Sequence, residues 1–288
     1  MTRRIVLLFA DTHAGHNLAL MNPTVKLPDH GPGDGDATYT PAATKMQRWL
    51  WQCYTDDIRK VRELAGDDEI VVVHVGDITW GTTHPDRLVS GVLSDQPYIA
   101  TANLLPLAVL DNVRTIRLIH GTCAHEMGHG SASEIVAQYL RGQFPDKSIA
   151  AVQHNLLDID GVEVDCAHHG PPTGSRSWLK GNVLRYAIKS QMIQDVLDGC
   201  EPPRVVVRGH YHECVKETVT LHGARDWETT GILLPSYAGL THYAQKVTRS
   251  AYKIGCGMAA FEIVAGHLTS EGVHLYRRAI DLRTRETL

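Results

Sequence analysis

The sequence is poor in aromatic residues, in long apolar runs and in excess charge. Aromatic residues make up 6% of its 288 residues. No run of about 18 apolar residues occurs, so we expect no transmembrane helix and no membrane partner. Lysine and arginine number 28 against 32 acidic residues, a formal net charge of −4, which disfavours a strong basic surface for duplex DNA.

Paired cysteines are also missing. The six cysteines are scattered without a C-x-x-C pair, a pattern typical of reduced thiols rather than of a disulfide framework. The short apolar run at residues 5–10 is interrupted by Asp11, and no small-residue cleavage site of a signal peptide follows it. These features predict a cytoplasmic protein.

Histidine is the one residue in clear excess. Hydrophobic residues make up 43% and charged residues 21% of the chain, ordinary values for a globular protein that exclude a disordered one. Against that background stand 17 histidines. Histidine is the commonest metal ligand in proteins, so the excess is a first indication of a metal site.

Strands and helices alternate along the first half of the chain. Continuous apolar runs predict buried strands at 4–10, 69–75 and 113–119. Apolar periodicity predicts a helix capped by Thr40 and ended by Gly66, and further helices at 98–110 and 131–144. Ser131 to Glu134 has the pattern of a capping box for the last of these.

The second half is richer in strands. A hairpin is expected from 149–159, an Asp160-Gly161 turn and 162–167, followed by a helix at 182–197. Short strands are then expected at 205–207, 214–221, 231–234, 259–264 and 272–276. This order predicts an α/β (α+β) fold of two packed mixed sheets with helices outside. We expect a single domain, residues 1–288, with a long loop insertion at about 14–43.

Five short segments each place histidine or aspartate just after an expected strand, where α/β proteins build their sites. They are Asp11-Thr12-His13, Gly76-Asp77, Gly121 to His125, His168-His169-Gly170 and Gly209-His210-Tyr211-His212. A carboxylate such as Asp77 is able to bridge two ions, as a two-metal hydrolytic site requires.

In this order the segments resemble the signature of the calcineurin-like metallophosphoesterases: D-x-H, G-D, G-N-H-(D/E), H and G-H-x-H. The resemblance covers residues 5 to 212. It implies a four-layer αββα sandwich with the metal site at the carboxyl ends of strands, in which the strand-rich remainder of the chain belongs to the second sheet. It also implies hydrolysis of a phosphate mono- or diester through a metal-bridging hydroxide that attacks phosphorus in line. The substrate is then a small molecule, a nucleotide or a short nucleic acid.

The resemblance further implies two divalent transition-metal ions, manganese, zinc or iron. Asp11, His13 and His212 would hold the first ion. His168, with His169 as the alternative, and His210 would hold the second. Asp77 would bridge the two and is essential for catalysis.

The third motif departs from the family pattern. The Asn ligand of the family is missing, and three residues rather than one separate Gly121 from His125. Some phage-type members carry a similar G-T-x-x-H variant, which makes His125 the counterpart of the catalytic histidine. The candidates to replace the Asn ligand are Thr122, Cys123 and Glu126.

The loop that follows His169 contains Arg176 and Lys180, two candidates for gripping a substrate phosphate. Arg208, next to Gly209, is a third.

Two rival hypotheses belong to other classes. His125-Glu126-Met127-Gly128-His129 is an H-E-x-x-H sequence, the signature of zinc metalloproteases. The glycines around it and the helix start expected at Ser131 argue against the long helix that this signature needs. The second rival is a degenerate, non-catalytic phosphoesterase fold that serves as a binding module, in which the loss of the Asn ligand would be expected.

Overall fold

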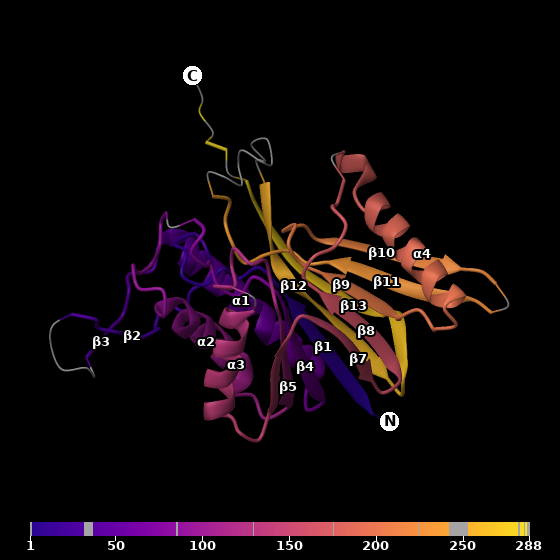
Figure 1. Cartoon of the computed structure of the whole chain (residues 1–288), viewed down its shortest axis with the longest axis horizontal. Helices are drawn as coiled ribbons and strands as arrows, with labels where there is room; N and C mark the ends of the chain where they lie inside the picture. The colour runs from indigo at the N-terminus through magenta and orange to yellow at the C-terminus, as the bar shows by residue number, and fades with distance from the viewer. Residues whose placement is uncertain are drawn as a thin grey trace.

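A six-stranded mixed sheet forms one half of the molecule (Figure 1). The computed structural model describes residues 2–31, 37–84, 86–128, 130–174, 176–223, 225–241, 253–281, 283–284 and 286. In this sheet β1, β4, β5 and β6 are mutually parallel, β12 is antiparallel to β1, and β13 is antiparallel to β12. The strand order is β13 (His267–Asp281), β12 (Lys253–Val264), β1 (Arg3–Phe9), β4 (Glu69–Val75), β5 (Val113–Ile119) and β6 (Ser148–Val152).

A five-stranded mixed sheet forms the other half. Its central strand β9 is parallel to both neighbours, β8 and β11, while the outer strands β7 and β10 are antiparallel. The strand order is β10 (Val215–Leu221), β11 (Trp227–Leu233), β9 (Val205–Arg208), β8 (Val162–Ala167) and β7 (His154–Ile159). The predicted α/β class with two mixed sheets is therefore confirmed.

The apolar runs in the strands are continuous because both faces of the six-stranded sheet are buried. In β4, Val71 and Val73 pack against the second sheet, where they meet Val164 and Val207. Val72, on the opposite face, packs against the helices. Strands covered on both sides lose the alternation of apolar and polar residues.

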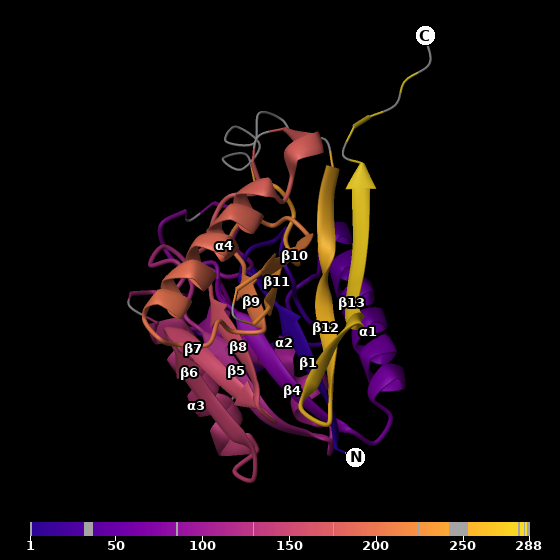
Figure 2. The ribbon, with the colours of Figure 1, turned by 90° about the vertical axis from the view of Figure 1, so that its right-hand side faces the viewer.

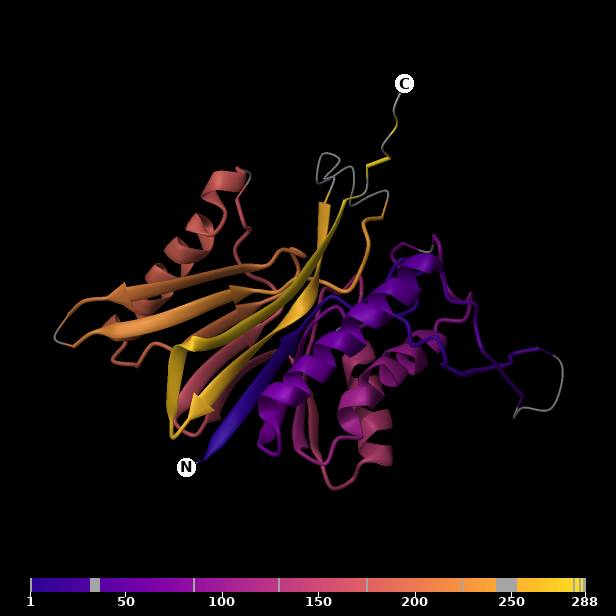
Figure 3. The same ribbon diagram turned by 180° about the vertical axis from the view of Figure 1, so that it is seen from behind.

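Four α-helices lie on the outer faces of the sheets in the part of the chain that the structure describes. α1 (Lys45–Ala65), α2 (Asp95–Ala108) and α3 (Ser131–Gln143) cover the six-stranded sheet (Figure 3). α4 (Asn182–Leu197) follows a short 3-10 helix, η1 (Ser177–Leu179), and packs on β10 and β11 (Figure 2). None of the described helices is long and apolar enough to cross a membrane.

Two strand assignments differ from the prediction. The expected strand at 149–159 is divided at Gln153: β6 pairs with β5 in the first sheet, whereas β7 pairs with β8 in the second. The last two strands, β12 and β13, were expected to belong to the second sheet but extend the first one beside β1. Apolar patterning predicts where a strand lies in the sequence but not which strand it pairs with. For this reason the division at Gln153 and the sheet of the last two strands were not predicted.

Residues 14–43 are less open than the term loop insertion suggests. Leu20, Met21 and Leu27 are fully buried in the core under the helices. The segment contains a small ribbon of β2 (Leu27–Pro28) and β3 (Thr38–Tyr39). Residues 32–36, in the Gly- and Asp-rich part of the expected loop, lie outside the described residues.

The helix starts correct two expectations. α1 begins at Lys45 rather than near Thr40, because Thr44 and Gln47 form the capping box: the Thr44 hydroxyl accepts the Gln47 N–H at 3.1 Å and Gln47 Oε1 accepts the Thr44 N–H at 2.9 Å. The box expected at Ser131 to Glu134 is absent, since Gly130 is the N-cap of α3 and no side chain caps there.

We therefore expect Thr44→Ala to lower the free energy of unfolding by about 1 kcal/mol, because the substitution leaves N–H groups of the first helical turn without partners. Ser131→Ala is the control and is expected to leave stability nearly unchanged. Urea unfolding followed by circular dichroism measures both. Equal losses would contradict this assignment of the caps.

Candidate metal centre

Seven side chains from five strand ends meet at one edge of the paired sheets. Each follows the carboxyl end of its strand, β1, β4, β5, β8 or β9. We call this set the candidate metal centre: Asp11, His13, Asp77, His125, His168, His210 and His212.

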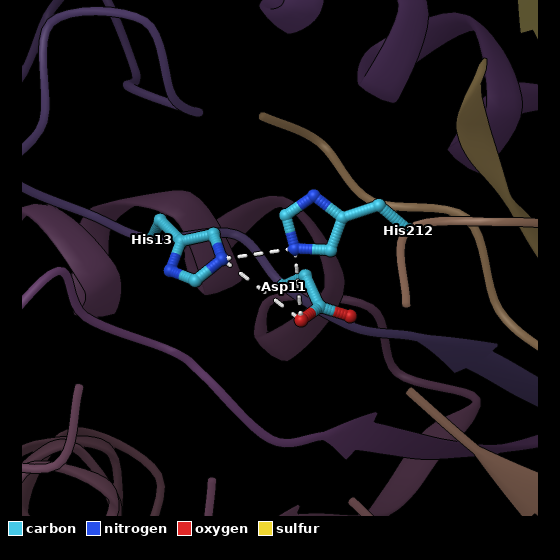
Figure 4. Close-up of side chains that lie close together, drawn as sticks. All are labelled: Asp11, His13 and His212. Atoms are coloured by element: carbon cyan, nitrogen blue, oxygen red, sulfur yellow. Dashed lines mark hydrogen bonds and ion pairs between the residues drawn. The ribbon is translucent and has the colours of Figure 1, made fainter. Parts of the chain in front are cut away.

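The first group consists of Asp11, His13 and His212, whose ligand atoms all lie within 4.8 Å of one another (Figure 4). The Nε2 atoms of His13 and His212 are 3.2 Å apart, and His212 Nε2 is 3.3 Å from Asp11 Oδ1. Two imidazole nitrogens and a carboxylate oxygen converging on one point are a typical donor set for a divalent cation.

The second group consists of Asp77, His168 and His210. The Nδ1–H of His168 donates to the carbonyl oxygen of Val75 at 2.8 Å. This bond orients the ring, so that Nε2 is directed towards Asp77 Oδ2, 3.2 Å away. A backbone carbonyl behind a metal-binding histidine orients its ring in the same way.

A third group joins the other two. His13, Asp77 and His125 also have ligand atoms within 4.8 Å of one another. His125 donates from Nδ1 to the carbonyl oxygen of Trp80 at 2.6 Å, which leaves Nε2 on the side of Asp77, 3.9 Å from Oδ2. Asp77 and His13 therefore each belong to two groups.

The backbone is strained where these side chains emerge. Asp11, His13, Asp77, His210 and His212 all have φ between 45° and 73°, the left-handed region that non-glycine residues rarely adopt. Each such residue costs on the order of 1 kcal/mol or more and persists only where the surroundings enforce it. With this backbone Asp11 and His13 of D-x-H enter the same ligand group, whereas His210 and His212 of H-x-H enter the second and the first group respectively.

Neighbouring imidazoles and carboxylates shift each other's pKa values. Burial by itself would raise the pKa of Asp77, but His168 and the other imidazoles around it hold that pKa well below its usual range. Burial would lower the pKa of His168, yet the Asp77 and Asp11 carboxylates raise it to about 9. Burial and the neighbouring His125 keep the pKa of His13 well below its usual value. The carboxylates are therefore ionised and in need of positive charge.

Buried atoms without partners test whether these residues fit a metal. Asp11 Oδ1 and His168 Nε2 are buried and make no hydrogen bond, although each has an ion-pair contact, with His212 at 3.3 Å and with Asp77 at 3.2 Å. Such atoms are costly to bury unless something satisfies them. A cation held by these carboxylate and imidazole groups would satisfy both atoms, so the donor set fits divalent metal binding.

In the loop after β5, polar groups form hydrogen bonds to Asp77 and within the loop. The N–H and hydroxyl of Thr122 donate to Asp77 Oδ1 at 2.6 and 3.0 Å. The buried Glu126 accepts from the Gly121 N–H and from the N–H and hydroxyl of Ser133, at 2.7, 3.0 and 2.7 Å. Cys123 is exposed. Neither Cys123 nor Glu126 belongs to a ligand group among the described residues, and the Thr122 hydroxyl is bonded to Asp77 instead.

The zinc-protease hypothesis lacks its helix. Residues 121–128 form turns, and α3 begins only at Ser131. His125 is therefore not on the helical face that H-E-x-x-H needs. His129 lies outside the described residues.

His169 belongs to no ligand group of the centre, and three basic residues predicted from the sequence remain. His169 is exposed and packs against the rings of His168 and His210. Arg176 is exposed, and Lys180 pairs with Glu213 at 2.7 Å. Arg208 is buried and pairs with Asp165 at 2.8 Å.

Sequence reasoning missed Trp80 and His16. A cavity of about 160 Å³ at the candidate metal centre is lined by Trp80 and His16 together with His13, Asp77 and His125. The Trp80 ring centroid lies 4.3 Å from that of His16 and 5.0 Å from that of His125. No motif marks either residue, although both are three positions beyond a predicted ligand.

Comparison with known proteins finds only weak structural similarities. No protein-family model and no curated protein matches the sequence. A conserved protein of Streptococcus pneumoniae, described as a predicted phosphoesterase, has 11% identity and a TM-score of 0.34, covering 96% of this chain and 99% of its own. The sulfate thiohydrolase SoxB of Thermus thermophilus has 11% identity and a TM-score of 0.40, covering 98% and 57%. A 5′-nucleotidase of Candida albicans has 10% identity and a TM-score of 0.33, covering 97% and 52%.

The scores are too low to carry any conclusion about activity, which has to come from the site itself.

Gly76 offers a test of the candidate metal centre that changes no ligand. A Cβ at this position, where φ is 89°, would lie 2.2 Å from His168 Nδ1. Gly76→Ala should displace the His168 ring and weaken metal binding by about 10- to 100-fold, as loss of a metal ligand's supporting contacts does.

Gly142→Ala is the matched control, because its Cβ would meet nothing within 4 Å on α3. Calorimetric titration with Mn²⁺ or Zn²⁺ measures both affinities. Unchanged affinity in a folded Gly76→Ala protein would exclude His168 as a ligand.

Proposed function

We propose that the protein is a metal-dependent phosphoesterase that binds two divalent transition-metal ions, manganese, zinc or iron. The observation that carries the proposal is the position of Asp77 between His168 and His210 on one side and His13 and His125 on the other. A carboxylate shared in this way supports two adjacent cations. Adjacent cations suit a phosphate ester, whose charge increases during in-line displacement.

Bound cations would lower the pKa of a water molecule and neutralise the phosphate oxygens. The chain's own residues hold that arrangement. Asp11, His13 and His212 would hold one ion, His168 and His210 the other, and Asp77 would join both. The Val75 and Trp80 carbonyls keep the His168 and His125 rings oriented before substrate arrives.

His125 has the geometry of a general acid. Its Nδ1–H is committed to the Trp80 carbonyl oxygen, and its ring lines the cavity together with Asp77. In its imidazolium form His125 would also carry a proton on Nε2, which it would give to the leaving oxygen of the ester. The lining of Trp80 and Ala238 gives the leaving group an apolar contact.

Asp77→Asn is expected to remove at least one bound ion and to abolish hydrolysis of p-nitrophenyl phosphate, because an amide cannot supply the charge that the two cations share. Elemental analysis after reconstitution with Mn²⁺ or Zn²⁺ gives the ion count, and p-nitrophenol release gives the rate. Two ions retained by Asp77→Asn would contradict the bridging role.

His125→Gln is expected to retain the ions and to lower kcat by about 10²- to 10⁴-fold, the usual contribution of a general acid. His222→Gln, at an exposed position paired with Asp226, is the control and should match the unmodified protein. Loss of ions in His125→Gln would make His125 a ligand instead. A protein that binds metal but hydrolyses no phosphate ester would favour the binding-only hypothesis.

A further inference from the structure

A second cavity adjoins the candidate metal centre. Its volume is about 690 Å³, and its lining includes His168 and Gly121. Gly121 packs so closely on Asp77 that a Cβ would lie 2.1 Å from Asp77 Oδ1. The second cavity shares no lining residue with the one beside Trp80. The site therefore has two separate spaces for substrate.

The lining of the second cavity suits an anion. Among the described residues it contains one arginine, four histidines and no carboxylate, although the whole chain is acidic. A larger cavity of about 1010 Å³, which shares only His154 with the second cavity, is lined by seven carboxylates. The lining residues of the second cavity are His120, Gly121, Cys123, Gly128, Gly130, Gln153, His154, Ala167, His168, His169 and Arg208.

Arg208 is the anchored donor of this cavity. Its side chain is buried, and its Nη1 donates to Asp165 Oδ1 at 2.8 Å and to the carbonyl oxygens of Asp165 and Val207 at 3.1 and 2.8 Å. All of its hydrogen bonds to the described residues use Nη1. The Nε and Nη2 donors remain for a ligand, and a guanidinium fixed in this way suits phosphate oxygens.

Asp165 holds the guanidinium group of Arg208 in position. It is almost fully buried, and besides Arg208 it pairs with His154 Nε2 at 2.7 Å and accepts from Gln191 Nε2 at 3.1 Å. Burial would raise the pKa of Asp165, but Arg208 and His154 lower it. The ionised carboxylate thus orients two lining residues, and it lines only the other, acidic cavity itself.

We propose that this second cavity binds a second anionic group of the substrate, held by Arg208 beside His154 and His169. The substrate class is then a phosphate compound that carries another phosphate besides the one that is cleaved. The proposal rests on the phosphoesterase function above, which supplies the first phosphate position. In this proposal Arg208 contacts the substrate, and Asp165 holds the Arg208 side chain in position.

The test compares propylphosphonate with ethylene-, propylene- and butylene-linked bisphosphonates, none of which is hydrolysed at its carbon–phosphorus bonds. Calorimetry on the metal-loaded protein gives each dissociation constant. At least one bisphosphonate should bind about tenfold more tightly than propylphosphonate, in keeping with the strength of charged hydrogen bonds.

Arg208→Gln combined with Asp165→Asn removes both charges together and leaves neither one buried without its partner. This double variant should lose the bisphosphonate advantage and keep the affinity for propylphosphonate. Arg204→Gln combined with Glu228→Gln is the matched control, since this pair stands near the opposite end of β9. The control should keep the advantage, and circular dichroism checks that both proteins fold.

The outcomes separate the two proposals. If propylphosphonate binds and no bisphosphonate binds more tightly, the second anion site is wrong and the phosphoesterase function stands. If propylphosphonate fails to bind the metal-loaded protein, both proposals fail. If inorganic phosphate binds twice per chain without any bisphosphonate advantage, the cavity takes free phosphate, which also overturns the substrate assignment.

Discussion

The rest of the site depends on two ionised carboxylates buried among imidazoles. Asp11 and Asp77 are almost completely removed from solvent, and each lies within 3.3 Å of a histidine nitrogen. Burying charge without compensation is expensive, so positive charge has to be delivered to both. The left-handed backbone at these positions and the close approach of Gly121 to Asp77 cost conformational energy. They persist because the strand ends hold these residues in place.

The supporting contacts come from residues that look catalytic in the sequence. Glu126 belongs to a metalloprotease-like motif, yet its carboxylate joins the Gly121 N–H to Ser133 at the start of α3. Asp165 has the same kind of function on the second sheet, where it holds Arg208 and His154. In both cases a buried acid holds neighbouring groups beside the candidate metal centre without belonging to a ligand group itself.

Much of this arrangement could be predicted from sequence, because motif residues at strand ends meet wherever the strands are parallel and adjacent. D-x-H after β1 and H-x-H after β9 meet across two different sheets, a contact that only the order of the motifs foretold. Sheet membership was less predictable: β12 is apolar enough for either sheet, and nothing local in the sequence selects β1 as its partner. The position of Trp80 beside His125 depends on three-dimensional packing. The start of α1 depends on which of the neighbouring threonines caps the helix, and the structure shows that it is Thr44.

The end of β9 links the two functions that we propose. Arg208 ends this strand facing the second cavity, and His210 and His212 follow it into the cavity beside Trp80. Any shift of the strand would move the anion donor and the candidate ligands together, so their spacing is set by covalent geometry. Gly209 is what allows this close fit, since a Cβ there would lie 2.7 Å from the Val75 carbonyl oxygen that orients His168. A substrate with two phosphates would use both cavities, whereas a single phosphate would use only one of them.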